Sequence, residues 1–529
     1  YVALKATASA ATFVGLPSVQ LSVTGLALSI NRATSDAATA TSPAPVIDFT
    51  QQTGGGLDIT VGAQTITLDF DARVATAAVT GGVLQIADFV HISGAFAFTK
   101  GITTTVTLTD STTKEVEVLQ VGGENIHLFA GVGGPYWADS NNDGVINTDD
   151  TPDAAPAIGL ALGDVAFAIA ILRPTDTADS ARYLALKVSA ASAELVGVES
   201  MISLAATGVT VEANRASDSA TTDPIAAIDF ALYNRAGFDV STGASNITLD
   251  YDRALLRVSV ADALLSISSF VYLRGGFAFE RGQPVVEDNG DGTTTDLDVL
   301  TVGTTNAYLF AGLGGPYWVD SNGDGVVDGS DTPAADAALG VAVGGVNLAI
   351  AFLEQSGVAD PVKYLAVKAT AATAGIVGLE SVLTVVARNS TLEINRAVDP
   401  AGERVAADFT GLAGGGLIVE TGGTPILIDF DHALLRVSVA DALIQISNFI
   451  YLRGGIAFER GIPVVEDLGG GQTRDLDVVT LGGSNIYLFA GSGGPYWVDS
   501  NSDGVVNTSD TPSSDGALGL AVGGVTFGL

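Results

Sequence analysis

Three acidic, glycine-punctuated loops recur along the chain, and their oxygen-bearing side chains are spaced for binding a metal ion. The second loop reads DSNGDGVVDGSD and runs from Asp320 to Asp331. With Asp320 as position 1, carboxylate or amide oxygens fall at positions 1, 3, 5, 9 and 12, and a glycine at position 6 permits a sharp turn. The main-chain carbonyl at position 7 adds one more oxygen. This is the order in which a twelve-residue loop wraps Ca²⁺, at roughly 2.3–2.6 Å.

The other two loops read DSNNDGVINTDD and DSNSDGVVNTSD, and each offers the same kind of ligand set. Positions 1, 3, 5, 6 and 12 are kept in all three loops, whereas position 4 changes from Asn to Gly to Ser. A plain acidic turn has no evident need for aspartate at position 12, so we predict Ca²⁺ as the cofactor. Mg²⁺ fits less well, because its strict octahedral geometry does not suit a long flexible loop. The predicted ligands, with the carbonyl oxygen as the ligand of each valine, are Asp139, Asn141, Asp143, Val145, Asn147, Asp150, Asp320, Asn322, Asp324, Val326, Asp328, Asp331, Asp499, Asn501, Asp503, Val505, Asn507 and Asp510.

An aromatic pair precedes each loop, as Tyr317 and Trp318 do in the second copy. We expect these rings to pack beside the loop and anchor it to the body of the protein, since large amphipathic rings bury well at such junctions. A sugar-binding aromatic platform is the alternative interpretation.

Pairs of aspartates two residues apart form a second recurring acidic feature. On a strand, a spacing of two places both carboxylates on one face. Such a pair suits a second cation site, a catalytic acid and base as in a glycosidase, or a solvent-facing strand end, which is the interpretation we favour. The pairs are Asp69 with Asp71, Asp250 with Asp252, and Asp429 with Asp431.

The acidic loops resemble the calcium loop of EF-hands, and more closely the dockerin version, which also ends in Asp. The resemblance covers about twelve residues in each loop. A dockerin pairs two loops with helices, whereas each loop here stands alone and is followed by Thr-Pro, as at Thr332 and Pro333, which disfavours a long exit helix. The resemblance therefore implies the ligand roles and not cohesin binding.

The elements that carry these loops belong to three tandem sequence repeats. YVALKATASAATFVGL at Tyr1 returns as YLALKVSAASAELVGV at Tyr183 and as YLAVKATAATAGIVGL at Tyr364, which gives periods of 182 and 181 residues. The repeats are residues 1–182, 183–363 and 364–529. The third repeat stops within the pattern, and we expect the chain to be part of a longer array.

The pattern within each repeat predicts an all-β fold. Val, Ile, Leu, Phe and Tyr alternate with polar residues over four or five positions, and the runs break at Gly, Asp or Asn. We expect the tandem repeats, of about 181 residues each, to stack as a β-solenoid, whose tight corners require small residues. Tandem β-sandwich domains are the alternative.

Charge and composition exclude several classes of protein. The net charge is −36, from 59 acidic and 23 basic residues, which argues against nucleic acid and anionic membrane surfaces as partners. The chain has no cysteine, which excludes disulfides and thiolate metal sites, and no run of 18 apolar residues that would predict membrane insertion. Cations such as Ca²⁺ would offset the self-repulsion of the acidic chain.

Taken as a whole, the chain resembles the giant extracellular calcium-binding repeat proteins of bacteria, which form adhesins, surface filaments and sheaths. The resemblance implies a structural protein outside the cell or at its surface, rigidified by Ca²⁺. Its partners would be neighbouring repeats, further chains in a filament or array, and glycans as an additional option. We predict no enzymatic activity, because the acidic residues repeat evenly rather than forming one unique cluster. A carbohydrate-binding or carbohydrate-active β-helical protein is the alternative function.

Overall fold

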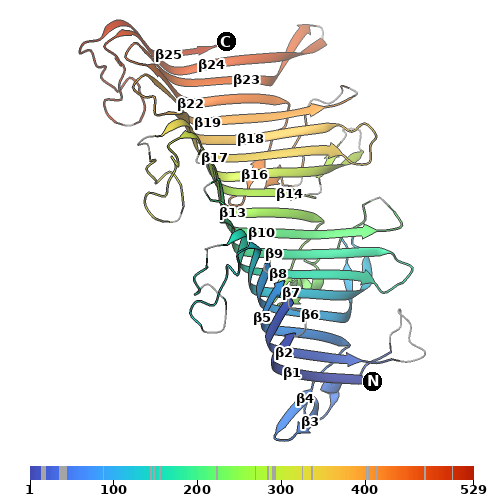
Figure 1. Cartoon of the computed structure of the whole chain (residues 1–529). Helices are drawn as coiled ribbons and strands as arrows, with labels where there is room; N and C mark the ends of the chain where they lie inside the picture. Colours follow the sequence, from blue (N-terminus) through green and yellow to red (C-terminus); the bar gives the residue numbers. More distant parts are fainter. Residues whose placement is uncertain are drawn as a thin grey trace. The chain divides into compact units, whose positions relative to one another are not determined.

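The chain is almost entirely β structure in a computed structural model (Figure 1). Two short 3-10 turns, Phe49–Gln51 and Tyr233–Arg235, are the helical segments of the part described, and neither is long or apolar enough to cross a membrane. The prediction of an all-β fold is confirmed. The structure describes the whole chain except residues 14–18, 35–43, 87–88, 143–145, 147–148, 154–156, 200, 222–223, 269, 283–284, 289–292, 325, 335–337, 401, 403–405, 413, 470–471 and 503.

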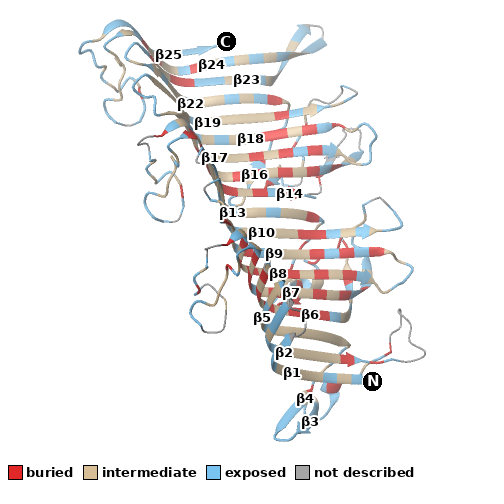
Figure 2. Ribbon diagram, viewed as in Figure 1, coloured by how far each residue is buried: buried red, intermediate tan, exposed pale blue. Residues whose placement is uncertain are grey.

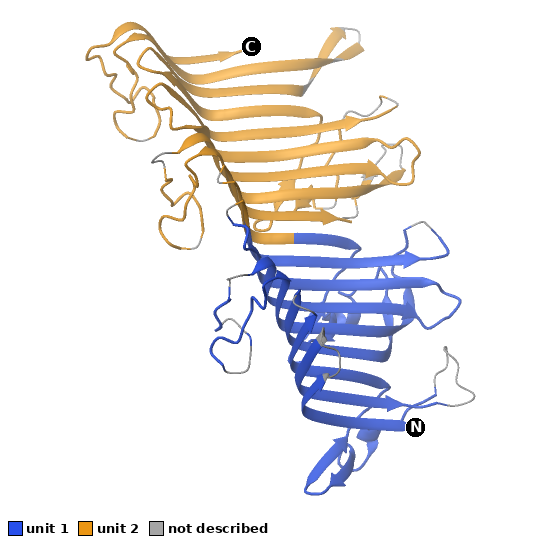
Figure 3. Ribbon diagram, viewed as in Figure 1, with its two compact units in different colours: residues 1–199, 204–258 blue, residues 200–203, 259–529 orange. Residues whose placement is uncertain are grey.

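The first of two compact units comprises residues 1–199 and 204–258 (Figure 3). Its long strands form an antiparallel meander in which each strand pairs with the next long strand along the chain. A two-stranded hairpin follows the second strand of the meander, and another follows the last. The meander strands are β1 (Val2–Phe13), β2 (Val19–Arg32), β5 (Val74–Ile86), β6 (Val90–Thr107), β7 (Thr113–Val132), β8 (Ile158–Pro174), β9 (Ala181–Val196) and β10 (Ile202–Asp218). The hairpins are β3 (Leu57–Val61) with β4 (Gln64–Leu68), and β11 (Phe238–Ser241) with β12 (Asn246–Leu249).

The second unit comprises residues 200–203 and 259–529, and it follows the same plan. Strand β13 (Leu255–Ile267) begins within the first unit and ends in the second. A hairpin of β20 (Leu417–Val419) and β21 (Ile426–Ile428) follows β19. The paired long strands are β14 (Val271–Arg281), β16 (Thr294–Leu313), β17 (Leu339–Gln355), β18 (Lys363–Val377), β19 (Leu383–Val398), β22 (Leu434–Ile446), β23 (Ile450–Gly469), β24 (Gln472–Ser492) and β25 (Leu518–Gly528), with the short β15 (Val285–Asp288) also on β16.

These registers do not establish the finer prediction of a β-solenoid. In the part of the chain that the structure describes, the long strands pair antiparallel, and consecutive long strands are direct neighbours. Stacked coils of a parallel β-helix would instead pair in parallel, each coil on the one before. The arrangement shown is a meander with small hairpins laid on it.

The compact units do not coincide with the sequence repeats. Residues 183–258 belong to the second repeat by sequence, yet all of them except residues 200–203 belong to the first unit by their contacts. They do so because β9 pairs with β8 of the first repeat, and because the β11–β12 hairpin lies against β7, β8 and β9. The beginning of one repeat therefore completes the core of the repeat before it.

A small hairpin and the sheet beneath it enclose the core of the first unit. Phe238, Val240 and Leu249 of the hairpin are no more than 3% exposed, and they join Val118 and Leu172 of the sheet in one apolar cluster. Figure 2 shows the buried bands on the strands under this hairpin. Removal of these apolar faces from water is the main driving force for the hairpin to lie on the sheet.

The second unit builds its core in the same way. Leu417, Val419 and Ile428 of the β20–β21 hairpin are no more than 4% exposed, and they pack with Val299 and Leu353 of the sheet. The same interface between a hairpin and a sheet is thus formed twice in the chain.

A buried asparagine fastens the segments that lead into and out of each hairpin. The Asn214 side chain is 1% exposed, and its Nδ2 donates to the carbonyls of Ile228 (2.7 Å) and Arg253 (2.8 Å). The same double hydrogen bond is made by Asn31 to Ile47 and Ala72, and by Asn395 to Ala407 and His432.

We predict that Asn214→Leu will lower the free energy of unfolding by about 1–3 kcal/mol, because two carbonyls lose their donor and one of them is buried. Urea unfolding measures the change. Asn246→Ala is the matched control on the exposed start of β12, where a change within about 0.5 kcal/mol is expected. Equal losses in the two variants would contradict the role assigned to Asn214.

Candidate metal centre

The three acidic loops occupy equivalent places between long strands. Residues 139–150 connect β7 to β8, residues 320–331 connect β16 to β17, and residues 499–510 connect β24 to β25. The second loop is the one in which all the predicted ligands are described. Asp143, Val145 and Asn147 of the first loop and Asp503 of the third lie outside the described residues.

A tryptophan fixes the start of each loop to the sheet. Trp318 Nε1 donates to the Leu309 carbonyl on β16 at 3.0 Å, and its ring meets Tyr317 edge-on at 4.8 Å between centroids. Tyr317 in turn stacks on Phe310 at 5.7 Å. The other copies repeat this arrangement, with Trp137 bonded to Leu128 and Trp497 bonded to Leu488. The expectation that the aromatic pair anchors the loop is confirmed.

The ring of this tryptophan packs closely on a glycine of the next strand. A Cβ added to Gly344 on β17 would lie 2.8 Å from Cζ2 of Trp318. The corresponding Gly163 and Gly523 stand in the same relation to Trp137 and Trp497, at 3.1 and 2.7 Å from the nearest indole carbon.

We predict that Gly344→Ala will displace the Trp318 ring and lower the free energy of unfolding by about 1–3 kcal/mol, as overpacking does. Urea unfolding followed by tryptophan fluorescence measures both effects. The control is Gly411→Ala, where the nearest atom to an added Cβ is 4.0 Å away. Unchanged fluorescence and stability in Gly344→Ala would show that the close fit is not needed.

The aspartate at position 12 closes each loop as a hydrogen-bonded clasp. Asp331 Oδ1 accepts the backbone N–H of Ser321 at 2.8 Å, and its Oδ2 accepts that of Asp328 at 2.8 Å. Asp510 makes the same pair of bonds to Ser500 and Asn507, each at 2.8 Å. The N–H of Asp328, with further backbone bonds, holds the pKa of the Asp331 carboxyl below its usual value of 3.8, so the clasp is charged at neutral pH.

This clasp corrects one step of the sequence argument. The statement that a metal-free turn does not need aspartate at position 12 is wrong, because Asp331 already has a structural task within the loop. Sequence reasoning also missed the serine at position 2. Ser321 Oγ lies 3.2 Å from Asp331 Oδ1 as a donor, and accepts the Thr332 N–H at 2.8 Å. Its identity in all three loops, as Ser140, Ser321 and Ser500, was the available signal.

The carboxylates and the amide at positions 1, 3 and 5 of the second loop are drawn together by hydrogen bonds. Asp320 Oδ1 accepts the N–H of Gly323 at 2.6 Å, and Asn322 Oδ1 accepts that of Asp324 at 2.9 Å. Asn322 Nδ2 donates to Asp324 Oδ2 at 3.0 Å. The result is a compact set of hard oxygen donors, which is the chemistry that Ca²⁺ prefers.

The far side of the loop is pinned at position 8. Val327 is 4% exposed, and its carbonyl accepts a hydrogen bond from Asn306 of β16 at 3.1 Å. Val506 and Asn485 repeat this bond in the third copy at 2.8 Å.

In the described residues no group of three or more Asp, Glu or His side chains is gathered as a metal site. The ligand set predicted for the second loop includes the Asn322 amide oxygen and the Val326 carbonyl oxygen as well as carboxylates.

The first aspartate of each strand pair forms an ion pair with a lysine. Asp69, Asp250 and Asp429 each receive a lysine ammonium group from the first long strand of the same repeat. The pairs are Lys5 with Asp69 (2.9 Å), Lys187 with Asp250 (3.2 Å) and Lys368 with Asp429 (2.7 Å). The second aspartates lie at the surface, where Asp252 pairs with Arg253 and Asp431 with His432. The arrangement is that of the solvent-facing strand end that we favoured from the sequence.

One histidine of the first copy replaces a tyrosine of the other two. His127 packs edge-on against Trp137 at 4.9 Å, as Tyr308 and Tyr487 do against their own tryptophans at 5.0 and 4.9 Å. Burial lowers the pKa of His127 below its usual value of 6.5. Because the fold favours the neutral ring, its contribution to stability is complete above pH 6.5 and declines as the pH falls below that value.

We predict that His127→Tyr will reduce the loss of stability between about pH 7 and about pH 5.5, the range in which a histidine is the residue that titrates. Thermal melts of the wild type and the variant across this range measure the difference. His432→Tyr is the control at a more exposed histidine beside Asp431. An unchanged pH dependence in His127→Tyr would contradict the assignment.

Comparison with known proteins supplies no family for this chain. No protein-family model matches it, and no curated protein matches it in sequence. Its function is therefore argued from the loops and the strands that carry them.

Proposed function

We propose that this chain is the structural repeat region of a secreted or cell-surface protein of the filament, adhesin or sheath type, rigidified by Ca²⁺ bound in one loop per repeat. The observation that carries the proposal is the threefold recurrence of one acidic loop on one support. In each copy the tryptophan, the clasp aspartate and the serine at position 2 make the same hydrogen bonds. Equal sites spaced along a chain suit a mechanical role better than catalysis, and we assign no enzymatic activity.

Calcium would act on the part of the loop that the clasp leaves to the surface. Asp320, Asn322 and Asp324, with the Val326 carbonyl and Asp328, are the residues that would hold the ion. A bound Ca²⁺ supplies positive charge and coordination to oxygens that otherwise repel one another. An affinity of about 10⁻⁴–10⁻³ M would suffice outside a cell, where calcium is abundant.

Repetition also supports the architecture that we propose for the array. Each repeat contributes the same series of strands, and the start of one repeat completes the core of the one before it. We propose that successive repeats add to one another in this way, as the coils of a solenoid do. Neighbouring repeats and further chains are then the principal partners.

An extracellular or cell-surface location in a bacterium fits the acidic, cysteine-free composition. The carbohydrate-binding alternative depends on the Tyr-Trp pairs. It is less favoured, because Trp318 is engaged with Leu309, Tyr317 and the surface of Gly344.

Variants at position 1 of each loop separate calcium binding from loop closure. In Asp139→Asn, Asp320→Asn and Asp499→Asn combined, an oxygen acceptor remains but the charge is lost. We expect CaCl₂ to raise the melting temperature of the wild type and a chelator to reverse the effect. In about 1 mM Ca²⁺, a site with a Kd of about 10⁻⁴ M contributes about 1.4 kcal/mol. The triple variant should lose this increment and keep the stability measured in chelator.

The matched control removes the same three charges elsewhere, in Asp71→Asn, Asp252→Asn and Asp431→Asn combined. This control should keep the full response to calcium. Loss of the response in this control alone would indicate that the ion binds at the strand aspartates.

Asp331→Asn should be less stable even in chelator, because an amide cannot accept both N–H groups. A wild-type melting temperature that is indifferent to millimolar calcium would overturn the proposed function.

A further inference from the structure

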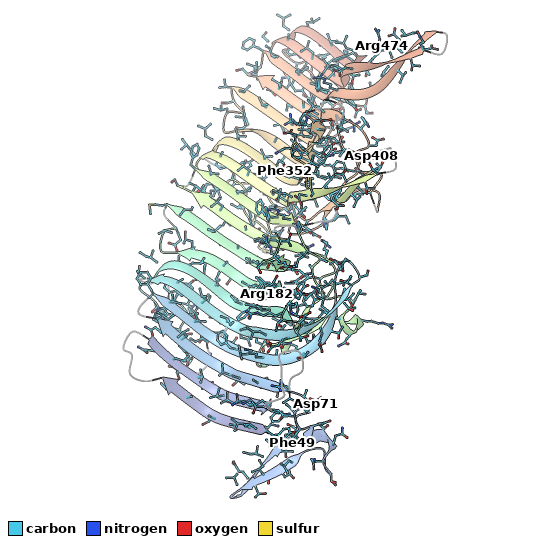
Figure 4. The ribbon with its side chains drawn as sticks, turned by 90° about the vertical axis from the view of Figure 1, so that its right-hand side faces the viewer. Phe49, Asp71, Arg182, Phe352, Asp408 and Arg474 are labelled. Carbon is cyan, nitrogen blue, oxygen red and sulfur yellow. The ribbon has the colours of Figure 1, made fainter. Side chains whose placement is uncertain are left out.

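A pocket lined by buried polar side chains lies beside the first acidic loop. It has a volume of about 250 Å³ and is formed by β5, β6, β7 and the segment that begins the loop. In Figure 4 the label on Asp71 marks the segment that leads into β5, the first of these strands. Each of the three strands is paired on both sides within this chain, so the pocket lies over the interior of the sheet and not at one of its edges.

Two buried polar atoms at this pocket lack a hydrogen-bond partner. His91 and Ser93 on β6 are 8% and 6% exposed, and neither His91 Nε2 nor Ser93 Oγ has a partner in the part of the chain that the structure describes. His127 on β7 lies directly opposite Ser93 in the sheet register and is 3% exposed. Its Nδ1 faces the Asn125 carbonyl at 3.4 Å, and because a carbonyl can only accept, Nε2 remains as an acceptor. Buried polar groups are normally paired, so this set points to a polar ligand.

The third copy fills the equivalent space with an ion pair. Arg453 on β23 binds Asp441 on β22 through two hydrogen bonds of 2.8 and 2.9 Å. It also donates to the Gly504 carbonyl of the third acidic loop, so its guanidinium bridges the sheet and the loop. In the first copy the counterparts of this pair are Ser93 and Gly81. Both members are replaced together by small residues, and the space between sheet and loop is open there.

The second copy agrees with the third and not with the first. It makes the same ion pair, between Arg274 and Asp262. Two tyrosines are kept in these two copies at the positions of His91 and His127. The tyrosines are Tyr272 and Tyr308 in the second copy, and Tyr451 and Tyr487 in the third. The first copy therefore departs from the other two by several replacements that meet at one pocket.

The pocket suits a neutral, hydroxyl-rich ring of the size of one sugar unit. Its volume is below the range of about 300–1,000 Å³ that holds drug-sized ligands, so one ring fits better than an oligomer. Ser93 Oγ can donate or accept and His127 Nε2 accepts, and the hydroxyl groups of a sugar can meet both needs. Val83 and the Trp137 ring supply apolar walls for its C–H groups. The net charge of −36, with Asp139 in the pocket lining, disfavours an anion.

We propose that this pocket of the first unit binds a neutral monosaccharide, as the terminal sugar of a glycan, with its hydroxyl groups held by His91, Ser93 and His127. The proposal adds a ligand to the structural role proposed above and does not depend on calcium. It also differs from a sugar platform on the Tyr-Trp pairs, because Trp137 keeps its bond to Leu128 and its ring forms only one wall.

A double variant closes the pocket with the residues of the other copies. Gly81→Asp with Ser93→Arg recreates an ion pair that the chain already forms twice and leaves the net charge unchanged, so it is expected to fold. Ser93→Ala removes one hydroxyl group and leaves the pocket open. Ser217→Ala, at an exposed serine on β10, is its matched control. Saturation-transfer difference NMR of the 529-residue chain in chelator measures binding of the methyl glycosides of glucose, galactose, mannose, fucose and N-acetylglucosamine.

At least one glycoside should bind the wild type and Ser217→Ala with equal affinity. The double variant should weaken this binding at least about tenfold, and Ser93→Ala should weaken it about threefold to tenfold, as loss of one hydrogen bond does. A wild type that binds none of the glycosides would overturn the proposal. So would undiminished binding by the double variant or by Ser93→Ala, since the sugar would then lie elsewhere. Because chelator is present throughout, the result is independent of calcium in the acidic loops.

Discussion

The main physical constraint on this structure is the repulsion among its carboxylates, which its other interactions must offset. With 59 acidic and 23 basic residues, most acidic groups have no basic partner available. The strand-end aspartates take the lysine that each repeat provides, as Lys368 does for Asp429. At the clasp of the acidic loop, backbone N–H groups supply the partial positive charge, and the lowered pKa of Asp331 reflects it. In the second loop, Asp320 and Asp324 also accept N–H groups, and a divalent cation would neutralise their charge directly.

The loop is held by its support before any ion is considered. Trp318 and Val327 attach it to β16 at its two sides, and Asp331 draws its ends together. Such prior ordering reduces the conformational entropy that binding would otherwise cost. An ion in the loop would then couple the end of β16 to the start of β17. Repeated in each copy, this coupling would stiffen the connections between neighbouring strands.

The sequence allowed prediction of the β class, the repeats and the position of the loops, because these depend on local pattern and self-similarity. It did not allow prediction of which distant residues meet. Lys5 and Asp69 are 64 positions apart, and the packing of Phe238 on strands of the preceding repeat has no local signal. The solenoid prediction assumed that short alternating strands form coils. The long registers between consecutive strands, such as β8 with β9, favour a meander instead.

The most direct test of calcium-stiffened repeats is anomalous diffraction from crystals of the chain grown in millimolar CaCl₂. The account predicts one calcium peak in each of the three loops, with the oxygens of Asp320, Asn322 and Asp324 at roughly 2.3–2.6 Å from the ion in the second. Well-ordered loops without an anomalous peak at that concentration would contradict it.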